Sequence, residues 1–310
     1  MSDLDRQEVD HEARRHAGDI RHATRYSEAV NRYLGAVGYQ EAGRAARKPE
    51  PRVDVVKPRG GTVVVGVDET PTSYTAVDHA AIEAELRGWD LRLLHVQHAG
   101  GIRSGARDAG ARLLERMTDR VHAYSPTVAV TSRISIGAAA PLLLSDTHDA
   151  SLVVVGHRHS AAGTAFGLSI GDRVAEHHSG PVLVVRVPGW PPGPDFGTRP
   201  IVVGVDESPM SQRAIDFAIA EGHVRGCDVV MLHAARQASA GNERLETYGG
   251  IQIHHRNLTG DPVPALIAAS GTAAAVVIGR RGFGGFAGVL LGSVSQAMIQ
   301  HALCPVFLVG

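Results

Sequence analysis

One pattern of residues occurs twice in this chain, and this repeat constrains the fold more than any other feature. The stretch "VVVGVDETPTSYTAVDHAAIEAELRGWDLRLLHV" starts at Val63, and "IVVGVDESPMSQRAIDFAIAEGHVRGCDVVMLHA" starts at Ile201. One constant offset aligns Gly66 with Gly204, Asp68 with Asp206, Glu83 with Glu221, Arg87 with Arg225, and His95 with His233. A repeat held in register over this length indicates a duplicated structural unit. We therefore expect two copies of one domain.

Short apolar runs alternate with helical patterns in each half. In the first half the strand-like runs lie near 63–67, 91–96, 128–134, 152–156 and 182–187, and the helical patterns near 73–87, 106–123, 138–147 and 169–178. The runs are continuous and rich in Val, Ile and Leu, as in strands covered on both faces. This rhythm predicts an α/β fold of two tandem, doubly wound, five-stranded parallel-sheet domains. In the second half the second helix should be short or missing, because little chain separates the second and third strands.

The chain divides into four segments at the sequence level. We expect a helical or flexible N-terminal extension (1–58), a first repeat (59–187), a linker (188–199) and a second repeat (200–310). The prolines and glycines of "PGWPPGPDFGTRP" are typical of an extended linker. Within the extension, apolar residues recur at spacings of three and four, which predicts an amphipathic helix ending near Gly35. Packing on its own chain, binding a partner, or disorder remain open for this extension.

Composition excludes several classes of protein. The net charge is −1, so no global field favours nucleic acid or a membrane surface. No stretch approaches the roughly 18 apolar residues of a transmembrane helix. Only Cys227 and Cys304 occur, which rules out a disulfide framework and favours a cytoplasmic protein. Lys48 and Lys57 are the only lysines, and both precede the first repeat, so a Walker A phosphate loop is absent.

A glycine-rich segment in the second half has the features of a phosphate site. It follows the fourth strand-like run, while Asp206 directly follows the first run. In open parallel sheets, ligands bind beyond the carboxyl ends of the strands. Gly292-Ser293 then opens the last helix, whose N–H groups and dipole suit a phosphate. We further expect Ser293 and Ser295 to add hydroxyl donors, and Arg280 and Arg281 to offer positive charge or simply to be solvated.

At these residues the chain resembles the universal stress proteins. "GRRGFGGFAGVLLGS" fits their nucleotide motif Gly-x2-Gly-x9-Gly-Ser/Thr, and "GVDES" and "CPV" also look like that family. The resemblance covers about 63–310 and implies Rossmann-like domains related to the adenine-nucleotide α-hydrolases. It implies ATP, with or without Mg²⁺, as ligand, while AMP and cyclic nucleotides stay open. The residues implied to hold the nucleotide are Val205, Asp206, Ala234, Ile278, Gly279, Gly282, Gly292, Ser293, Val294 and Ser295.

The first half departs from that motif. Gly156 and Ser169 are kept, but His159 and Leu168 stand at the second and third glycine positions. A side chain at each of these positions would crowd a triphosphate. We therefore expect weak or no ATP binding by the first half, with Asp68 as a relic of the duplication.

Three functions remain open for the sequence. The first is an adenine-nucleotide-binding protein of stress response or signalling; the others are a slow ATP hydrolase and a scaffold with vestigial pockets. No base, metal cluster or activated nucleophile stands out near the glycine segment, which favours binding. The scattered histidines show no metal-ligand spacing. We expect the final strands of the two repeats to pair within the chain, with pseudo-two-fold symmetry, because exposed strand edges invite pairing. Homodimerisation and an unknown protein partner stay open.

Overall fold

The first half alternates strands and helices as its sequence predicts. The computed structural model describes residues 24–36, 60–97, 104–157, 169–187, 190, 196–206, 208–235, 243–281 and 291–310. In the first half these form β1 (Thr62–Val67), α3 (Pro71–Arg87), β2 (Asp90–Gln97), α4 (Ser104–Tyr124), β3 (Val130–Ile136), α5 (Ala139–Asp146), β4 (Leu152–His157), α6 (Ile170–His177) and β5 (Val182–Arg186). Each predicted strand and helix of this half is confirmed, with ends shifted by a few residues.

The second half repeats this order with one change. Its elements are β6 (Ile201–Val205), α7 (Pro209–Arg225), β7 (Val229–Ala235), β8 (Arg244–Tyr248), β9 (Ile251–Thr259), α8 (Pro262–Ser270), β10 (Ala275–Gly279), α9 (Ser293–His301) and β11 (Val306–Val309). Where the first half has α4, the described residues hold β8, which pairs antiparallel with β9. The sequence analysis expected a short or missing helix but not this strand. Gly249 and Gly250, both at positive φ, form the turn, and a Gly-Gly pair between strands is a hairpin signal.

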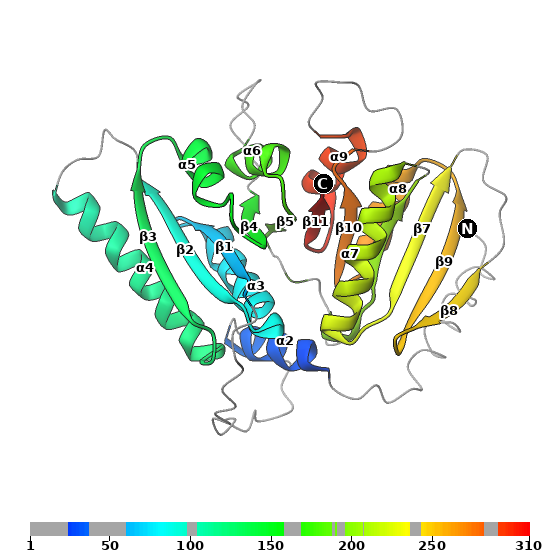
Figure 1. Cartoon of the computed structure of the whole chain (residues 1–310), viewed down its shortest axis with the longest axis horizontal. Coiled ribbons are helices and arrows are strands. Elements are labelled where there is room, and N and C mark those ends of the chain that lie inside the picture. Colours follow the sequence, from blue (N-terminus) through cyan, green and yellow to red (C-terminus); the bar gives the residue numbers. More distant parts are fainter. Residues whose placement is uncertain are drawn as a thin grey trace, which may run out of the picture.

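The strands of the described residues form one continuous sheet of 11 strands (Figure 1). Their order is β3-β2-β1-β4-β5-β11-β10-β6-β7-β9-β8. The two halves meet where β5 and β11 pair antiparallel, with Leu183 opposite Phe307. The predicted internal pairing of the final strands is therefore confirmed. An antiparallel pair at the centre relates the halves by a pseudo-two-fold axis.

Each face of the sheet carries its own layer of helices. Val63 and Val65 of β1 belong to one apolar cluster, together with residues of α2, α3, α4 and α7. Val64 belongs to another, together with residues of α5, α6, α8 and α9. Successive side chains of a strand point to opposite faces, so both faces of β1 are buried. This is the doubly wound arrangement that the sequence predicts.

Helix α2 (Arg25–Ala36) packs beneath the junction of the two halves (Figure 1). Tyr26, Val30 and Tyr33 on one side of this helix are fully buried, and α2 contacts α3, α4 and α7. The Tyr33 hydroxyl lies 3.2 Å from Ser125 Oγ. The predicted amphipathic helix is confirmed, and it packs on its own chain. The domain boundaries near 58, 187 and 199 stay predictions.

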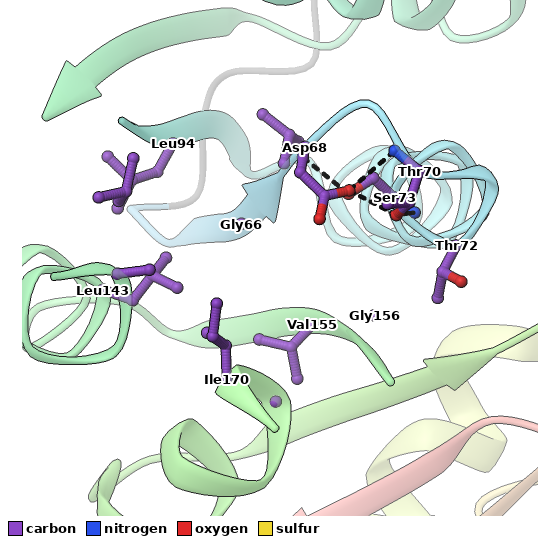
Figure 2. Close-up of a pocket in the computed structure, with 14 residues that line it drawn as sticks. Gly66, Asp68, Thr70, Thr72, Ser73, Leu94, Leu143, Val155, Gly156 and Ile170 are labelled. Carbon is purple, nitrogen blue, oxygen red and sulfur yellow. Dashed lines mark hydrogen bonds between the residues drawn. The ribbon is translucent and has the colours of Figure 1, made fainter. Parts of the chain in front are cut away.

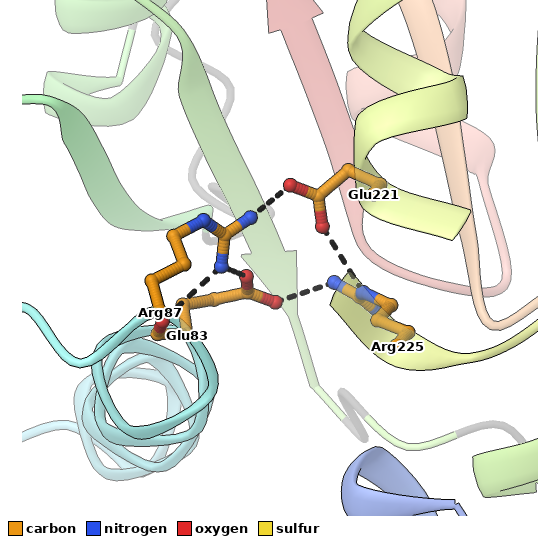
Figure 3. Close-up of polar contacts among 4 residues, drawn as sticks. All are labelled: Glu83, Arg87, Glu221 and Arg225. Atoms are coloured by element: carbon orange, nitrogen blue, oxygen red, sulfur yellow. Dashed lines mark hydrogen bonds and ion pairs between the residues drawn. The ribbon is translucent and has the colours of Figure 1, made fainter. Parts of the chain in front are cut away.

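Four charged residues join α3 and α7 across that junction (Figure 3). Glu83 and Arg87 come from the first half, and Glu221 and Arg225 from the equivalent positions of the second. Each arginine bonds the glutamate of its own helix and that of the other helix; Arg225 Nε lies 3.1 Å from Glu221 Oε2. Burial raises the pKa of Glu83, but Arg225 and Arg87 outweigh it and hold that pKa below its usual value. We call these four residues the junction tetrad.

Candidate functional site

The strand order reverses at two places, which are equivalent in the two halves. In the first half β1 lies between β2 and β4, and in the second β6 lies between β7 and β10. The connections from β1 and from β4 leave the sheet on opposite faces, which opens a crevice at the carboxyl ends of these strands. The predicted site residues belong to the crevice of the second half.

Asp206 anchors the turn between β6 and α7. Its Oδ1 atom accepts from the Ser208 backbone N–H (3.0 Å) and hydroxyl (2.5 Å). The Ser211 hydroxyl in turn accepts from the Asp206 N–H at 3.0 Å. Val205 ends β6 just before this turn and is half-buried, while Asp206 is exposed. Ser208 therefore holds the Asp206 carboxylate and Ser211 holds its backbone N–H, and the sequence analysis did not single out either serine.

A set of hydrogen bonds ties the start of α9 to the end of β10. The buried Ser295 hydroxyl lies 2.8 Å from the Gly279 carbonyl and 3.2 Å from the Arg280 carbonyl. The Gly292 N–H donates to the same Arg280 carbonyl at 2.7 Å. The structure thus brings Gly279, Gly292 and Ser295 together. In this arrangement the Ser295 hydroxyl is committed to backbone carbonyls.

Gly279 is required by packing in its own right. A Cβ atom at this position would lie 3.3 Å from Met210 Cβ and 3.2 Å from the Arg281 carbonyl oxygen. Gly156, its equivalent, faces Thr72 in the same way, with 2.7 Å to Thr72 Cγ2. The first glycine of the motif therefore lets the helix that follows the neighbouring strand, α7 after β6 and α3 after β1, approach closely in both halves.

The remaining predicted residues lie on β7, on β10 and in the first turn of α9, or outside the described chain. Ile278 is buried over Gly204, where an added Cβ would lie 3.1 Å from Ile278 Cγ2. Ala234 follows His233, which pairs with Val205 in the β6–β7 register. Val294 is half-buried and Ser293 is exposed in the first turn of α9. Gly282 lies outside the described residues.

The start of α9 carries no side-chain cap in the described structure. Its N-cap residue is Gly292, at φ −71° and ψ 158°, and its first turn holds no acidic residue. An uncapped helix start leaves backbone N–H groups and the positive end of the helix dipole for an anion. The φ of Gly292 is one that any residue adopts, so a side chain at this position would not strain the backbone.

Arg280 does not face solvent as the sequence allowed. Its side chain is buried and bonds the Gly180 carbonyl of the first half. Burial, and then the neighbouring Arg281, lower the pKa of Arg280 to about 10. Arg280 therefore links the two halves, and the exposed Arg281 is the described arginine of this pair that remains at the surface.

The equivalent crevice of the first half contains a cavity of about 100 Å³ (Figure 2). Asp68 stands at one end, where its Oδ1 accepts from Thr70 and, at 2.8 Å, from the Ser73 hydroxyl. On the other side lies α6, whose start is closed by a capping box. Ser169 Oγ accepts from the Asp172 N–H at 3.1 Å, and the Asp172 carboxylate accepts from the Ser169 N–H at 2.9 Å. The two crevices thus have the same fold. Among the described residues, side chains cap the helix start in the first half (α6) but not in the second half (α9).

Comparison with known proteins agrees with this geometry. The model of the universal stress protein family matches residues 61–186, 197–248 and 234–310. The chain belongs to the universal stress protein family. The match spans both halves, as expected for tandem copies of one family domain.

Relatives and solved structures of the same family resemble the chain over different lengths. The universal stress protein Rv1996 of Mycobacterium tuberculosis is 29% identical over 301 residues, covering 79% of this chain and 93% of that protein. The crystal structure of a universal stress protein from Archaeoglobus fulgidus aligns with a TM-score of 0.63 at 18% identity, covering 80% of this chain and 95% of that one. A universal stress protein solved in complex with cAMP is 28% identical, with a TM-score of 0.36, and covers 41% of this chain and 96% of that one.

Two negative findings apply to the described part of the chain. Its histidine, cysteine and acidic residues form no group of three that could hold a metal ion. None of its helices combines the length and apolar character needed to cross a membrane.

Proposed function

We propose that this universal stress protein binds an adenine nucleotide, ATP in the first instance, in its second half, and acts in stress response or signalling through that binding. The observation that carries the proposal is the start of α9. Its N-cap is Gly292, its first turn holds no acidic residue, and none of the described side chains caps it. The glycine-rich segment that fits the family's nucleotide motif leads into this helix.

The surrounding residues suit a nucleoside triphosphate. The half-buried Ala234 gives apolar surface for a base on the sheet face that holds the buried Ile278, and Val205 lies on the other face. The exposed Asp206 carboxylate suits a ribose hydroxyl, which is a hydrogen-bond donor. The N–H groups and the exposed Ser293 hydroxyl at the start of α9 suit the phosphates. The exposed Arg281 lies two residues beyond the end of β10 and adds positive charge at that end of the strand. We propose binding rather than hydrolysis, because no catalytic base or metal cluster accompanies the described residues.

The variant Ser293→Glu tests this proposal. A glutamate in the first turn interacts favourably with the helix dipole, so α9 keeps its stability or gains a few tenths of a kcal/mol. The same carboxylate repels a phosphate and competes with it for the N–H groups of the first turn. We therefore expect the affinity for ATP to fall at least roughly a hundredfold, about 3 kcal/mol. Titration calorimetry on the full chain measures this loss. The matched control is Thr272→Glu, an exposed position away from the crevice, which should bind ATP like the parent.

The stoichiometry of the parent gives a second readout. We expect one ATP per chain, since the start of α6 is closed by Ser169 and Asp172. Unchanged ATP binding by Ser293→Glu would refute the proposed site, and two equivalent sites would refute its restriction to the second half. Absence of ATP binding by the parent would favour a scaffold, and Mg²⁺-dependent phosphate release would favour a hydrolase.

We also propose that the chain acts in the cytoplasm. Cys227 and Cys304 are free, buried thiols, which is the usual state in a reducing compartment. Cell fractionation with an antibody against the chain tests this location.

A further inference from the structure

The cavity of the first half is a built space with a polar end and an apolar body (Figure 2). Asp68, which is exposed, stands at its polar end together with the hydroxyls of Thr70 and Ser73. The body is formed by side chains from β2, β4, α5 and α6. These apolar lining residues are Leu94, Val96, Ala139, Leu143, Val155 and Ile170. Such a lining, apolar with a few placed polar groups, resembles that of small-molecule sites, but at about 100 Å³ the cavity holds only part of a ligand, the rest of which would extend outside it.

Among the described residues, the carboxylates nearest this cavity in the chain are those of Asp68 and Asp172. Ile170 and Gly171, the first residues of α6, form part of the wall, and Asp172 follows them. Burial raises the pKa of Asp172, but hydrogen bonds from His157 and Ser169 outweigh it and hold that pKa below its usual value. Asp172 is therefore ionised at neutral pH and occupies the helix start. An anion entering the cavity would meet the Asp68 carboxylate, and the start of α6 already has its N–H groups bonded within the capping box of Ser169 and Asp172.

We propose that the first half has become a separate ligand site that selects against phosphate. It takes a small neutral or cationic molecule with an apolar body and a hydroxyl or amino donor. The apolar body lies between Leu94, Leu143 and Ile170, and the donor faces Asp68. The chain then carries two sites of opposite charge preference on the same fold: one for an anion at α9, one for a phosphate-free ligand at the first-half cavity.

Adenosine and AMP are matched probes for this site, because they differ only by the phosphate. The full chain carrying Ser293→Glu and Asp206→Asn is titrated with each, because these changes act on the proposed phosphate and ribose contacts of the second half. We expect adenosine to bind and AMP to bind roughly tenfold more weakly. Ala139→Phe, which fills the cavity, should abolish adenosine binding. Ala111→Phe, on the exposed side of α4, adds the same side chain elsewhere and should leave adenosine binding unchanged.

A charge variant tests phosphate exclusion without filling the cavity. Asp172→Asn keeps an acceptor for the Ser169 N–H but removes the negative charge. We expect AMP binding to improve roughly three- to fivefold, with adenosine binding unchanged. The proposal is overturned if adenosine does not bind, if Ala139→Phe leaves its binding intact, or if AMP binds as tightly as adenosine before Asp172 is replaced. The two proposals fail separately, because Ala139→Phe acts on the first half and Ser293→Glu on the second.

Discussion

The starts of helices α6 and α9 hold equivalent places in the two halves but are built from different side chains. In α6, Ser169 and Asp172 close the helix with a reciprocal capping box. In α9, the N-cap is Gly292, and in the described structure no side chain bonds the first turn. A closed start satisfies its own N–H groups, whereas an open start requires water or a ligand to do so. Duplication thus preserved the crevice while the chemistry at its helix diverged.

The junction tetrad, in contrast, has the same residue types in both halves. Glu83 and Arg87 occupy the same positions as Glu221 and Arg225, and each pair completes the other. Buried charges must be neutralised by partners, so neither half can change its pair alone. A shared interface preserves similarity between the halves, and a site with a separate ligand releases it.

The largest expected effect comes from replacing one glutamate of the junction tetrad. Glu83→Gln and Glu221→Gln each leave two buried arginines with one carboxylate. We expect each to lower the free energy of unfolding by about 3–5 kcal/mol, as for removal of one partner of a buried ion pair. Urea denaturation followed by circular dichroism measures the loss. The control is Glu243→Gln at an exposed position, which should change stability by less than about 0.5 kcal/mol. If only one of the two variants lost several kcal/mol of unfolding free energy, Glu83 and Glu221 would not contribute equally to the junction.

The next prediction concerns Asp78 and Asp216, which occupy equivalent positions in the two repeats but differ in burial. Arg120 of α4 bonds both oxygens of Asp78, at 2.6 and 2.8 Å, and the carboxylate is buried. Burial outweighs Arg120 and raises the pKa of Asp78 to about 6. Asp216 is exposed. In the described part of the second half, β8 takes the place of α4 in the order of elements, so α7 has no helix equivalent to α4 beside it. The same residue type therefore lies in different surroundings in the two halves.

Asp78→Asn tests this difference through pH. A raised carboxyl pKa means that folding favours the protonated form, so its stabilisation is present below about pH 4 and lost as pH rises through about 6. The asparagine variant lacks this loss. Its stability relative to the parent should rise by about 3 kcal/mol between about pH 4 and pH 7. Urea denaturation across this range measures it. A flat difference for Asp78→Asn would contradict the assignment.

The smallest effect compares the two helix starts directly. Ser169→Ala removes the cap of α6 and should lower stability by about 1 kcal/mol. Gly292→Ser adds a capping hydroxyl to α9 and should change stability by only a few tenths of a kcal/mol. Thermal unfolding of the two variants measures both. Equal and opposite changes of about 1 kcal/mol would mean that the α9 start behaves as an ordinary helix terminus waiting for a cap.

Much of the fold was determined by the sequence alone. The repeat, the order of strands and helices, the absent helix of the second half and the amphipathic helix α2 all follow from local patterns of apolar residues, glycine and proline. Pairing of β5 with β11 also followed, because both are apolar strands that end their repeats. Such features depend on the residue types within one segment and on whether that segment is buried, and sequence periodicity reports both.

Only the tertiary structure decided which side chains face one another. It placed Arg280 against Gly180 of the other half, committed the Ser295 hydroxyl to two backbone carbonyls, and joined Glu83 to Arg225 across the junction. It also left the cavity beside Asp68 and buried Asp78 while Asp216 stayed exposed. These partners are far apart along the chain, and their contacts depend on strand register and helix packing. The capping box of Ser169 and Asp172 is local, so its spacing was readable in the sequence; its meaning emerged only beside the open start of α9.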